Sequence, residues 1–445
     1  MHKIALINPG SKLNNDAARG EPLQLGYLAA YLRQRGVEVI IIDEPTGGNL
    51  KEELEAFNPG FVGVTAATSV VNDAYRILSY CRRKGFKTVI GGVHASTMPD
   101  EATKYADYVV VGEGEEALFS LIDKDLPTGT LKYPHIKNID ELPHPDRSLM
   151  NMEFYLNQKN NIPVNVHYFL PDKTRLATII TSRGCPYECI FCHNNWRGLP
   201  ARYHSADYVF NEIMDIKTKY DNGALYFQDD DFFINKKRLL DICKKLCDSR
   251  LNIIWAASAR VSSIDKEVLE AAYQAGCRQI NFGIETGSQK VLDTLNKRTT
   301  VKLGEEAIKM ARKAGLLVYA SFMIGNPGET VEDMKMTKRF IMRNRLDSFY
   351  VSITAPYPGT ALWEWCKTRK LIPESFSWDQ FSWTDCGVPA NEFLTRKQIE
   401  LMRLNIFFGS MLRMNLGFIW FNLRYLFRNP SYFISRFLKY IKQFF

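Results

Sequence analysis

The sequence predicts an α/β protein built from two successive βα series and a helical C-terminal segment. Short apolar runs alternate with stretches of helical spacing in residues 1–125 and again in residues 176–365. Residues 126–175 lie between the two series and are rich in Pro, Asn and charged residues, which is typical of an extended linker. Residues 366–445 end in an aromatic and basic stretch. We therefore expect two domains, a linker and a C-terminal segment with these boundaries.

The first series predicts a doubly wound parallel sheet. Apolar runs typical of strands occur at residues 3–7, 37–42, 61–65, 87–90 and 108–111, with helical spacing at 24–34, 50–57 and 72–84. Such βα units form right-handed crossovers, and their ligands bind at the carboxyl ends of the strands. No G-x-G-x-x-G sequence follows the first strand and no P-loop is present, which argues against a dinucleotide site.

The second series predicts a partial barrel. Strand candidates occur at residues 176–181, 224–228, 252–257, 278–284, 317–323 and 349–354. Stretches of helical spacing follow them at residues 206–220, 236–249, 266–275, 288–296, 301–314 and 331–343. Six strands are two short of a closed eight-stranded barrel, so we expect an open (βα)6 barrel with its chemistry at the carboxyl ends of the strands.

Composition and charge restrict the class of protein. The 445-residue chain is 46% hydrophobic and 24% charged, which is ordinary for a globular protein, and it has no run of 18 uncharged apolar residues. Of the net charge of +8, seven units lie in residues 401–445, which contain seven Lys or Arg and no acidic residue. Nine cysteines and the absence of a secretory signal sequence predict a reducing, cytoplasmic location.

One short loop, SRGCPYECIFCHN at residues 182–194, predicts a metal centre. Its cysteines are spaced three and two residues apart and are Cys185, Cys189 and Cys192. Three thiolates can hold three corners of a 4Fe-4S cluster and leave the fourth iron open to a ligand. The alternative is a zinc site in which His193 or His204 completes the set.

The loop and the barrel resemble the radical S-adenosylmethionine (SAM) family. The resemblance implies that Phe191 packs on the adenine of SAM and that Asp229 and Asp230, after the second strand, bind its amino group. It also implies binding roles for three residues at later strand ends, namely Arg260 for the SAM carboxylate, Glu285 for the ribose and Gly325 for the adenosine. Taken singly, each has an ordinary alternative: residues 229–231 could cap a helix, and Glu285 could be a surface acid.

The first series resembles the cobalamin-binding domain that many radical SAM enzymes carry. The resemblance assigns Thr65, Gly91 and Gly92 to the nucleotide tail of cobalamin, and adds Glu113 of VVGEGE to the site. In place of the D-x-H-x-x-G motif of other cobalamin enzymes the chain has DEPTGG, in which proline replaces the histidine ligand of cobalt. His94 could replace that ligand. Two interpretations remain open: cobalamin bound without a histidine from the protein, or a vestigial domain that binds no corrin.

The C-terminal segment suggests a surface role. Residues 379–391 are irregular and aromatic, and we expect them to fold over the open side of the barrel as part of a substrate wall. Residues 396–412 have helical spacing. Residues 414–445 interleave aromatic and basic residues, which predicts a helix in a membrane interface. The alternative is a tail that packs on the barrel, and we rank nucleic acid below both because the stretch is strongly apolar.

The resemblance implies a cobalamin-dependent radical SAM enzyme, of the kind called class B methyltransferases. Such an enzyme forms a 5′-deoxyadenosyl radical from SAM and methylates an unactivated carbon of a small molecule, with a flavodoxin or ferredoxin as electron donor. The apolar, basic tail suggests a lipid or isoprenoid substrate. The first alternative is a cyclase or oxidative rearrangement enzyme like the anaerobic magnesium-protoporphyrin ester cyclase. The second is a cobalamin-binding or metal-binding regulatory module without turnover.

Overall fold

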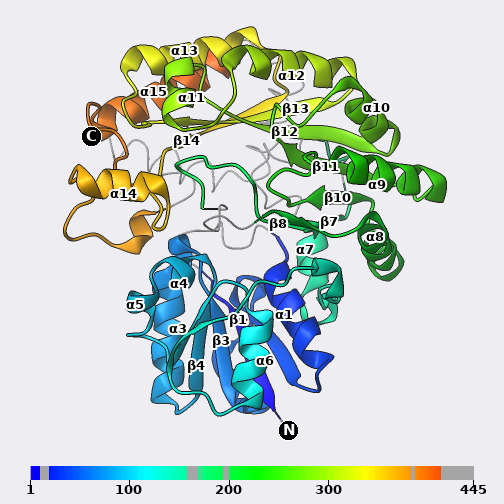
Figure 1. Cartoon of the computed structure of the whole chain (residues 1–445), viewed down its shortest axis with the longest axis vertical. Coiled ribbons are helices and arrows are strands. Elements are labelled where there is room, and N and C mark those ends of the chain that lie inside the picture. Colours follow the sequence, from blue (N-terminus) through cyan, green and yellow to red (C-terminus); the bar gives the residue numbers. More distant parts are fainter. Residues whose placement is uncertain are drawn as a thin grey trace.

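The computed structural model describes residues 2–10, 20–157, 169–171, 173–193, 200–381 and 386–411. Two α/β units are stacked on each other, and the strands of the N-terminal sheet run towards the barrel above them (Figure 1). Asn194 of the cysteine loop, residues 382–385 and residues 412–445 lie outside the described residues, so the predicted interfacial stretch does too. None of the described helices is long and apolar enough to cross a membrane.

The N-terminal unit is the predicted doubly wound parallel sheet, with strand order β2-β1-β3-β4-β5-β6. Its strands are β1 (Lys3–Asn8), β2 (Glu38–Asp43), β3 (Phe61–Thr65), β4 (Lys87–Gly91), β5 (Tyr108–Val111) and β6 (Gly129–Lys132). Its helices are α1 (Leu23–Arg33), α2 (Leu50–Phe57), α3 (Val71–Arg83), α4 (Val93–Thr97), α5 (Pro99–Ala102) and α6 (Glu115–Asp123). Four successive residues of β1, from Ile4 to Ile7, are almost fully buried because helices cover both faces of the sheet.

The second unit is the predicted open barrel, in which six parallel strands follow the order β7-β10-β11-β12-β13-β14. These are β7 (Leu176–Ile179), β10 (Ala224–Phe227), β11 (Ile254–Ala259), β12 (Cys277–Glu285), β13 (Leu317–Ile324) and β14 (Ser348–Ile353). The helices on the outer side are α8 (Ala206–Tyr220), α9 (Lys236–Ser249), α10 (Lys266–Gln274), α11 (Gln289–Thr294), α12 (Val301–Lys313) and α13 (Val331–Arg343) (Figure 1). A short antiparallel hairpin of β8 (Ser182–Arg183) and β9 (Arg202–Tyr203) encloses the cysteine loop.

The stretch that we expected to be only a linker also contributes regular structure. Strand β6 extends the N-terminal sheet beyond residue 125, and α7 (Met152–Leu156) packs near β7. Between them, Arg147 is buried and binds the barrel twice, through Glu212 Oε1 of α8 at 2.8 Å and the carbonyl of Thr178 at 2.9 Å. The linker is therefore part of the packing between the two units.

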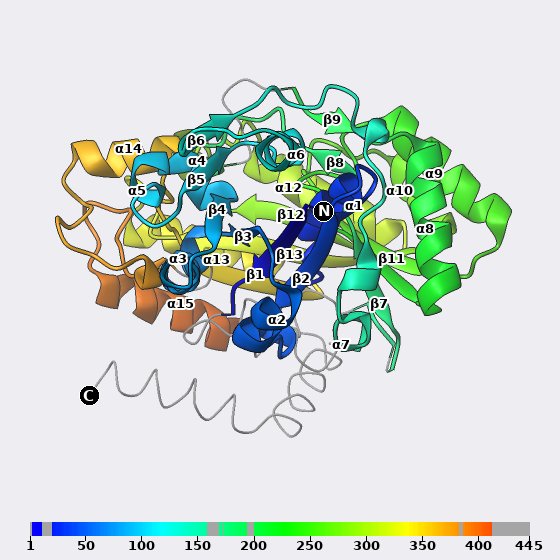
Figure 2. The ribbon, with the colours of Figure 1, turned by 90° about the horizontal axis from the view of Figure 1, so that it is seen from below.

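The C-terminal segment packs against the N-terminal unit as well as the barrel. After α14 (Ala361–Thr368), the indole of Trp378 donates to Glu101 of α5 at 2.8 Å, and its ring lies edge-on to His94. Trp363 and Phe381 belong to the same buried apolar cluster as the N-terminal strands. Helix α15 (Arg396–Met411) then runs along α13 on the outside of the barrel, and the view from below shows α14 and α15 on the side opposite α8 and α9 (Figure 2).

The Arg147–Glu212 pair predicts a large effect on stability. Replacing Arg147 with Met leaves the carboxylate of Glu212, which is 1% exposed, buried without a cation. We expect a loss of about 3–5 kcal/mol in the free energy of unfolding, measured by chemical denaturation. The double variant Arg147→Met/Glu212→Met should recover most of that loss. Arg175→Met, which breaks the exposed pair with Glu153, is the matched control and should have little effect; equal losses in both single variants would contradict the prediction.

Candidate functional site

The cysteine loop lies at the carboxyl end of β7, where the barrel faces the N-terminal unit. Cys189 is 8% exposed, whereas Cys185 and Cys192 are partly exposed. Backbone hydrogen bonds fix the loop from two directions: the amide of Ile190 donates to the carbonyl of Leu295 at 3.1 Å, and the carbonyl of Ile190 accepts from Leu362 of α14 at 2.8 Å. The loop therefore has a defined shape although it contains no long helix or strand.

The cysteine loop offers the donor set of an iron–sulfur cluster, which is three thiolates in one short loop. No three His, Cys, Asp or Glu side chains in the described part of the chain converge on a point that could hold one metal ion. A cubane bonds each thiolate to a different iron, so its cysteines need no common point. His204, one candidate for the zinc set, is buried, stacks on Tyr208 and lies 3.2 Å from Asp140. The three cysteines fit a 4Fe-4S cluster with one open iron.

Arg260, at the end of β11, contacts the loop directly. Its Nη1 lies 3.5 Å from the sulfur of Cys189, its Nη2 donates to the carbonyl of Lys297, and its guanidinium stacks on Tyr187 with 3.5 Å to the ring centroid. The Nε–H is buried and has no hydrogen-bond partner among the described residues. Arg260 is thus a brace for the cysteine loop, with one donor left over for the SAM carboxylate that the resemblance assigned to it.

Glu285, Phe191 and Lys297 gather on one side of the loop. Glu285 ends β12 with a positive φ of 68°, and its carboxylate binds Lys297 Nζ at 2.6 Å. The same Nζ lies 5.7 Å from the ring centroid of Phe191, and both charged side chains are about nine-tenths buried. The sequence reasoning missed Lys297, although it belongs to a short basic run that follows α11. A buried ammonium beside Phe191 suits a ligand with an anionic group.

Asp229 and Asp230, which follow β10, differ in their surroundings. Asp229 is buried and accepts hydrogen bonds from the amide and the hydroxyl of Thr181 at 3.0 and 2.8 Å and from Ser182, so it holds the start of the cysteine loop. Burial raises its pKa. Asp230 is exposed, yet desolvation and the charges of Asp229 and Asp231 raise its pKa to about 6. Asp230 therefore suits the SAM amino group better than Asp229 does.

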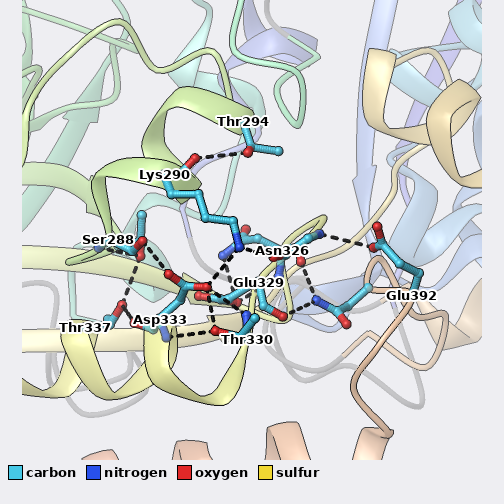
Figure 3. A network of polar contacts seen from close by, with 12 residues as sticks. Ser288, Lys290, Thr294, Asn326, Glu329, Thr330, Asp333, Thr337 and Glu392 are labelled. Atoms are coloured by element: carbon cyan, nitrogen blue, oxygen red, sulfur yellow. Dashed lines mark hydrogen bonds and ion pairs between the residues drawn. The ribbon is translucent and has the colours of Figure 1, made fainter.

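The loop after β13 contains a polar network around Asn326, Glu329 and Thr330 that fixes its backbone (Figure 3). Gly325 belongs to this loop. Its φ is +79°, and a β-carbon there would lie 2.9 Å from Ile399 of α15. Glu329 Oε2 accepts from the amides of Gly325 and Asn326 at 2.6 and 2.9 Å. The other oxygen of Glu329 is buried without a hydrogen-bond partner among the described residues, and burial raises the pKa of this carboxyl group to about 7. The loop assigned to the adenosine is therefore held by a carboxyl group that is half protonated near neutral pH.

The same network extends to neighbouring elements. Asp333, at the start of α13, accepts from Ser288 Oγ at 2.7 Å and from the amide of Thr330, with which it forms a capping box. Lys290 donates to the carbonyl of Gly328 at 2.8 Å (Figure 3). These bonds tie the loop after β12 to the loop after β13.

Three of the predicted cobalamin residues lie together at the carboxyl ends of β3 and β4. We call this end of the N-terminal sheet the cobalamin edge. Thr65 pairs in register with Gly91, and Gly92 follows with a φ of +95°. A β-carbon at Gly92 would lie 2.8 Å from the carbonyl oxygen of Ala66 and 3.0 Å from the hydroxyl of Thr65, so only glycine allows the two loops to approach this closely. Glycines at the carboxyl ends of strands also let a large cofactor approach the backbone closely.

His94 and Glu113 lie in different surroundings from those three. His94 is fully buried, its Nδ1 lies 3.2 Å from Thr68 Oγ1, and its Nε2 is 3.7 Å from Glu101. This position favours a structural role over cobalt ligation. Both carboxylate oxygens of Glu113 bind arginines of the β8–β9 hairpin. The remaining predicted residues, Thr65, Gly91 and Gly92, suit cobalamin that is bound without His94 as a ligand of cobalt.

The raised pKa of Glu329 predicts a pH-dependent stability. Unfolded glutamate has a pKa near 4.5, so between pH 4.5 and 7 the folded state keeps a proton that the unfolded state has released. Stability from this group is therefore lost as pH rises, by about 2 kcal/mol between pH 5.5 and 8. Thermal unfolding of Glu329→Gln should lack this slope, whereas Glu332→Gln, an exposed acid of α13, should keep it. An unchanged slope in Glu329→Gln would sink the prediction.

Comparison with known proteins agrees with this geometry. Residues 179–341 match the model of the radical SAM superfamily, and residues 13–122 match that of the B12 binding domain. An uncharacterized methyltransferase of Pyrococcus horikoshii is 31% identical over 86% of this chain and 86% of its own length. The anaerobic magnesium-protoporphyrin IX monomethyl ester cyclase of Rubrivivax gelatinosus is 27% identical over 81% of this chain and 69% of its own length.

A solved structure has the same arrangement of domains. The radical SAM methyltransferase TsrM of Kitasatospora setae, with cobalamin and a 4Fe-4S cluster bound, superposes with a TM-score of 0.68 at 19% identity, covering 84% of this chain and 80% of that one. Its likeness is in the fold. Together with the family models and the relatives, the cysteine loop, the open barrel and the glycine-lined edge lead to one conclusion: this chain belongs to the cobalamin-dependent radical SAM enzymes, whose cofactors are SAM, a 4Fe-4S cluster and cobalamin.

Proposed function

We propose that the protein methylates a carbon atom of a small molecule, with SAM as both radical source and methyl donor. The observation that carries this proposal is the position of the cysteine loop, which lies between the carboxyl ends of the barrel strands and the cobalamin edge of the N-terminal sheet. Arg260 holds Cys189 on the barrel side, and Arg183 holds the start of the loop against the N-terminal unit. A substrate between the barrel and the N-terminal sheet would therefore lie between SAM, the radical source, and cobalamin, the methyl carrier. A methylation requires this position.

Within this site the residues of the chain bind, orient and exclude water. When bound, the cluster supplies the electron that cleaves SAM, and cobalamin carries the methyl group. Cys185, Cys189 and Cys192 would hold the cluster, and Phe191 would pack on the adenine. Asp230 and the Glu285–Lys297 pair would orient the charged ends of SAM and its ribose. Arg260 and Lys297 are buried, so their polar contacts lie where water reaches poorly and are stronger than they would be at the surface.

Labelled SAM distinguishes methylation from the alternatives. The anaerobically reconstituted protein is incubated with methyl-labelled SAM, a one-electron donor and either an aqueous or a lipid extract of cells that produce it. We expect label in a new product together with 5′-deoxyadenosine. An unlabelled product would favour the cyclase or oxidative alternative, and a lack of 5′-deoxyadenosine would favour a regulatory module. Cys185→Ala is the control and should lose iron and SAM cleavage together.

The electron donor and the substrate class are part of the same proposal. Radical SAM enzymes act on small molecules and take electrons from reductants. We propose a flavodoxin or ferredoxin as the donor and a lipid or isoprenoid as the substrate class. The latter is supported by exposed apolar side chains of α15, at Leu401, Phe407 and Phe408, because this helix precedes the aromatic and basic residues 414–445 in the chain.

The exposed apolar residues of α15 and the aromatic and basic residues 414–445 predict that the protein binds membranes. The full chain should sediment with liposomes that contain anionic lipid, and less with neutral liposomes, because basic residues near an anionic surface each contribute about 1 kcal/mol. Deleting residues 414–445 removes five Lys or Arg and should abolish the binding while iron content is unchanged. Equal sedimentation of the full and shortened chains would leave the tail as a segment that packs on the barrel.

A further inference from the structure

Four charged side chains join the N-terminal unit to the cysteine loop. Glu113 Oε1 accepts from Arg183 at 3.0 Å and from Arg202 at 2.8 Å, and its Oε2 accepts from Arg202 at 3.0 Å. Glu115 Oε1 accepts from Arg183 at 2.6 Å. The backbone amide of Ile136 completes the set by donating to Glu113 Oε2 at 2.9 Å. We call these four side chains the carboxylate clamp.

The clamp grips both strands of the hairpin from which the cysteine loop emerges. Arg183 and Arg202 are paired residues of β8 and β9, and the loop with all three cysteines lies between them in the chain. Cys185 follows Arg183 by two residues. A displacement of Glu113 would therefore move both ends of the loop at once, whereas the braces at Arg260 and Ile190 act only within the loop.

The clamp is also a place where the two units meet through charge. Glu113 and Glu115 follow β5, whose carboxyl end belongs to the edge that carries Thr65 and Gly91. All four side chains are largely buried, with exposed fractions from 3% for Glu115 to 20% for Arg183. Loss of a carboxylate there would leave arginines without a counter-charge in a place that water reaches poorly. The arginines hold the pKa of Glu113 at about 2 despite its burial, so Glu113 stays ionised at neutral pH.

We propose that the carboxylate clamp fixes the distance between the cysteine loop and the cobalamin edge, with Glu113 as the positioning residue. This assigns Glu113 to the joint between the domains and not to corrin binding. The inference rests on the family of the chain and is independent of whether methyl transfer is the reaction. It separates two tasks: the cysteines hold the cluster, and the clamp sets where the cluster lies relative to the N-terminal unit.

Hydrogen exchange of the full, cluster-loaded chain without SAM or substrate tests the clamp. Glu113→Gln should speed amide exchange in the β8–β9 hairpin about tenfold, because the hairpin would open locally. Glu116→Gln is the matched control: this neighbouring acid binds Tyr31 and does not touch the hairpin. The N-terminal sheet should exchange as in the wild type. Unchanged hairpin exchange, or equally fast exchange throughout the sheet, would overturn the proposal.

A second variant and a spectroscopic readout keep the test independent of folding. Arg202→Gln leaves the Glu113–Arg183 contact in place and should give a smaller increase in exchange. In protein loaded with cob(II)alamin and reduced cluster, the electron-spin relaxation of cobalt depends on its distance from the cluster. Glu113→Gln should change that relaxation, and Glu113→Asp, which keeps the charge, should recover part of it. An identical relaxation in wild type and Glu113→Gln would refute a positioning role. Failure of methylation alone would affect neither measurement.

Discussion

The fixing of one short loop by buried charge is the constraint on which the rest of the structure depends. The cysteine loop has no long helix or strand of its own, so its shape depends on contacts with the elements around it. Arginines supply these contacts: Arg260 reaches the sulfur of Cys189, and Arg183 and Arg202 hold the two ends of the loop. Each arginine is in turn fixed, by Tyr187 and Lys297 or by Glu113. The barrel and the N-terminal sheet thus position the loop through charge.

Several carboxylates at the strand ends accept hydrogen bonds from the protein itself and hold neighbouring loops in place. Asp229 holds Thr181 and Ser182, Glu113 holds the hairpin, and Glu329 holds the amides after β13. A carboxylate offers two acceptors, and a loop that leaves a strand has unpaired amides that need them. A family motif can therefore include an acidic residue that never meets the cofactor. Asp230 is exposed, and Glu285 is paired with Lys297, so these acids do not hold the backbone of a neighbouring loop in the same way.

The sequence predicted the parallel strands well, because strands buried on both faces read as apolar runs. The observed strands of both units begin and end within about two residues of the predicted ranges. It missed β6, whose four residues GTLK alternate between half-buried and exposed and lie at the sheet edge. It predicted the cysteines from their spacing, and Phe191 from the family resemblance. It could not place His94, because Trp378, which covers it, is distant in the chain, nor could it find Lys297, whose role comes from its contact with Glu285.

The polar residues at the strand ends limit where substrate specificity can change. Polar side chains at the strand ends hold loops in place: Asp229 and Arg260 hold the cysteine loop, and Glu329 holds the loop after β13, so changing them to suit a new substrate would disturb these loops. The C-terminal segment reaches both units: Trp378 contacts Glu101 and His94, while Asn391 donates to the carbonyl oxygens of Asn326 and Glu329. Substrate recognition is therefore freest to change in this segment, because its apolar contacts tolerate substitution better than a buried charge network does.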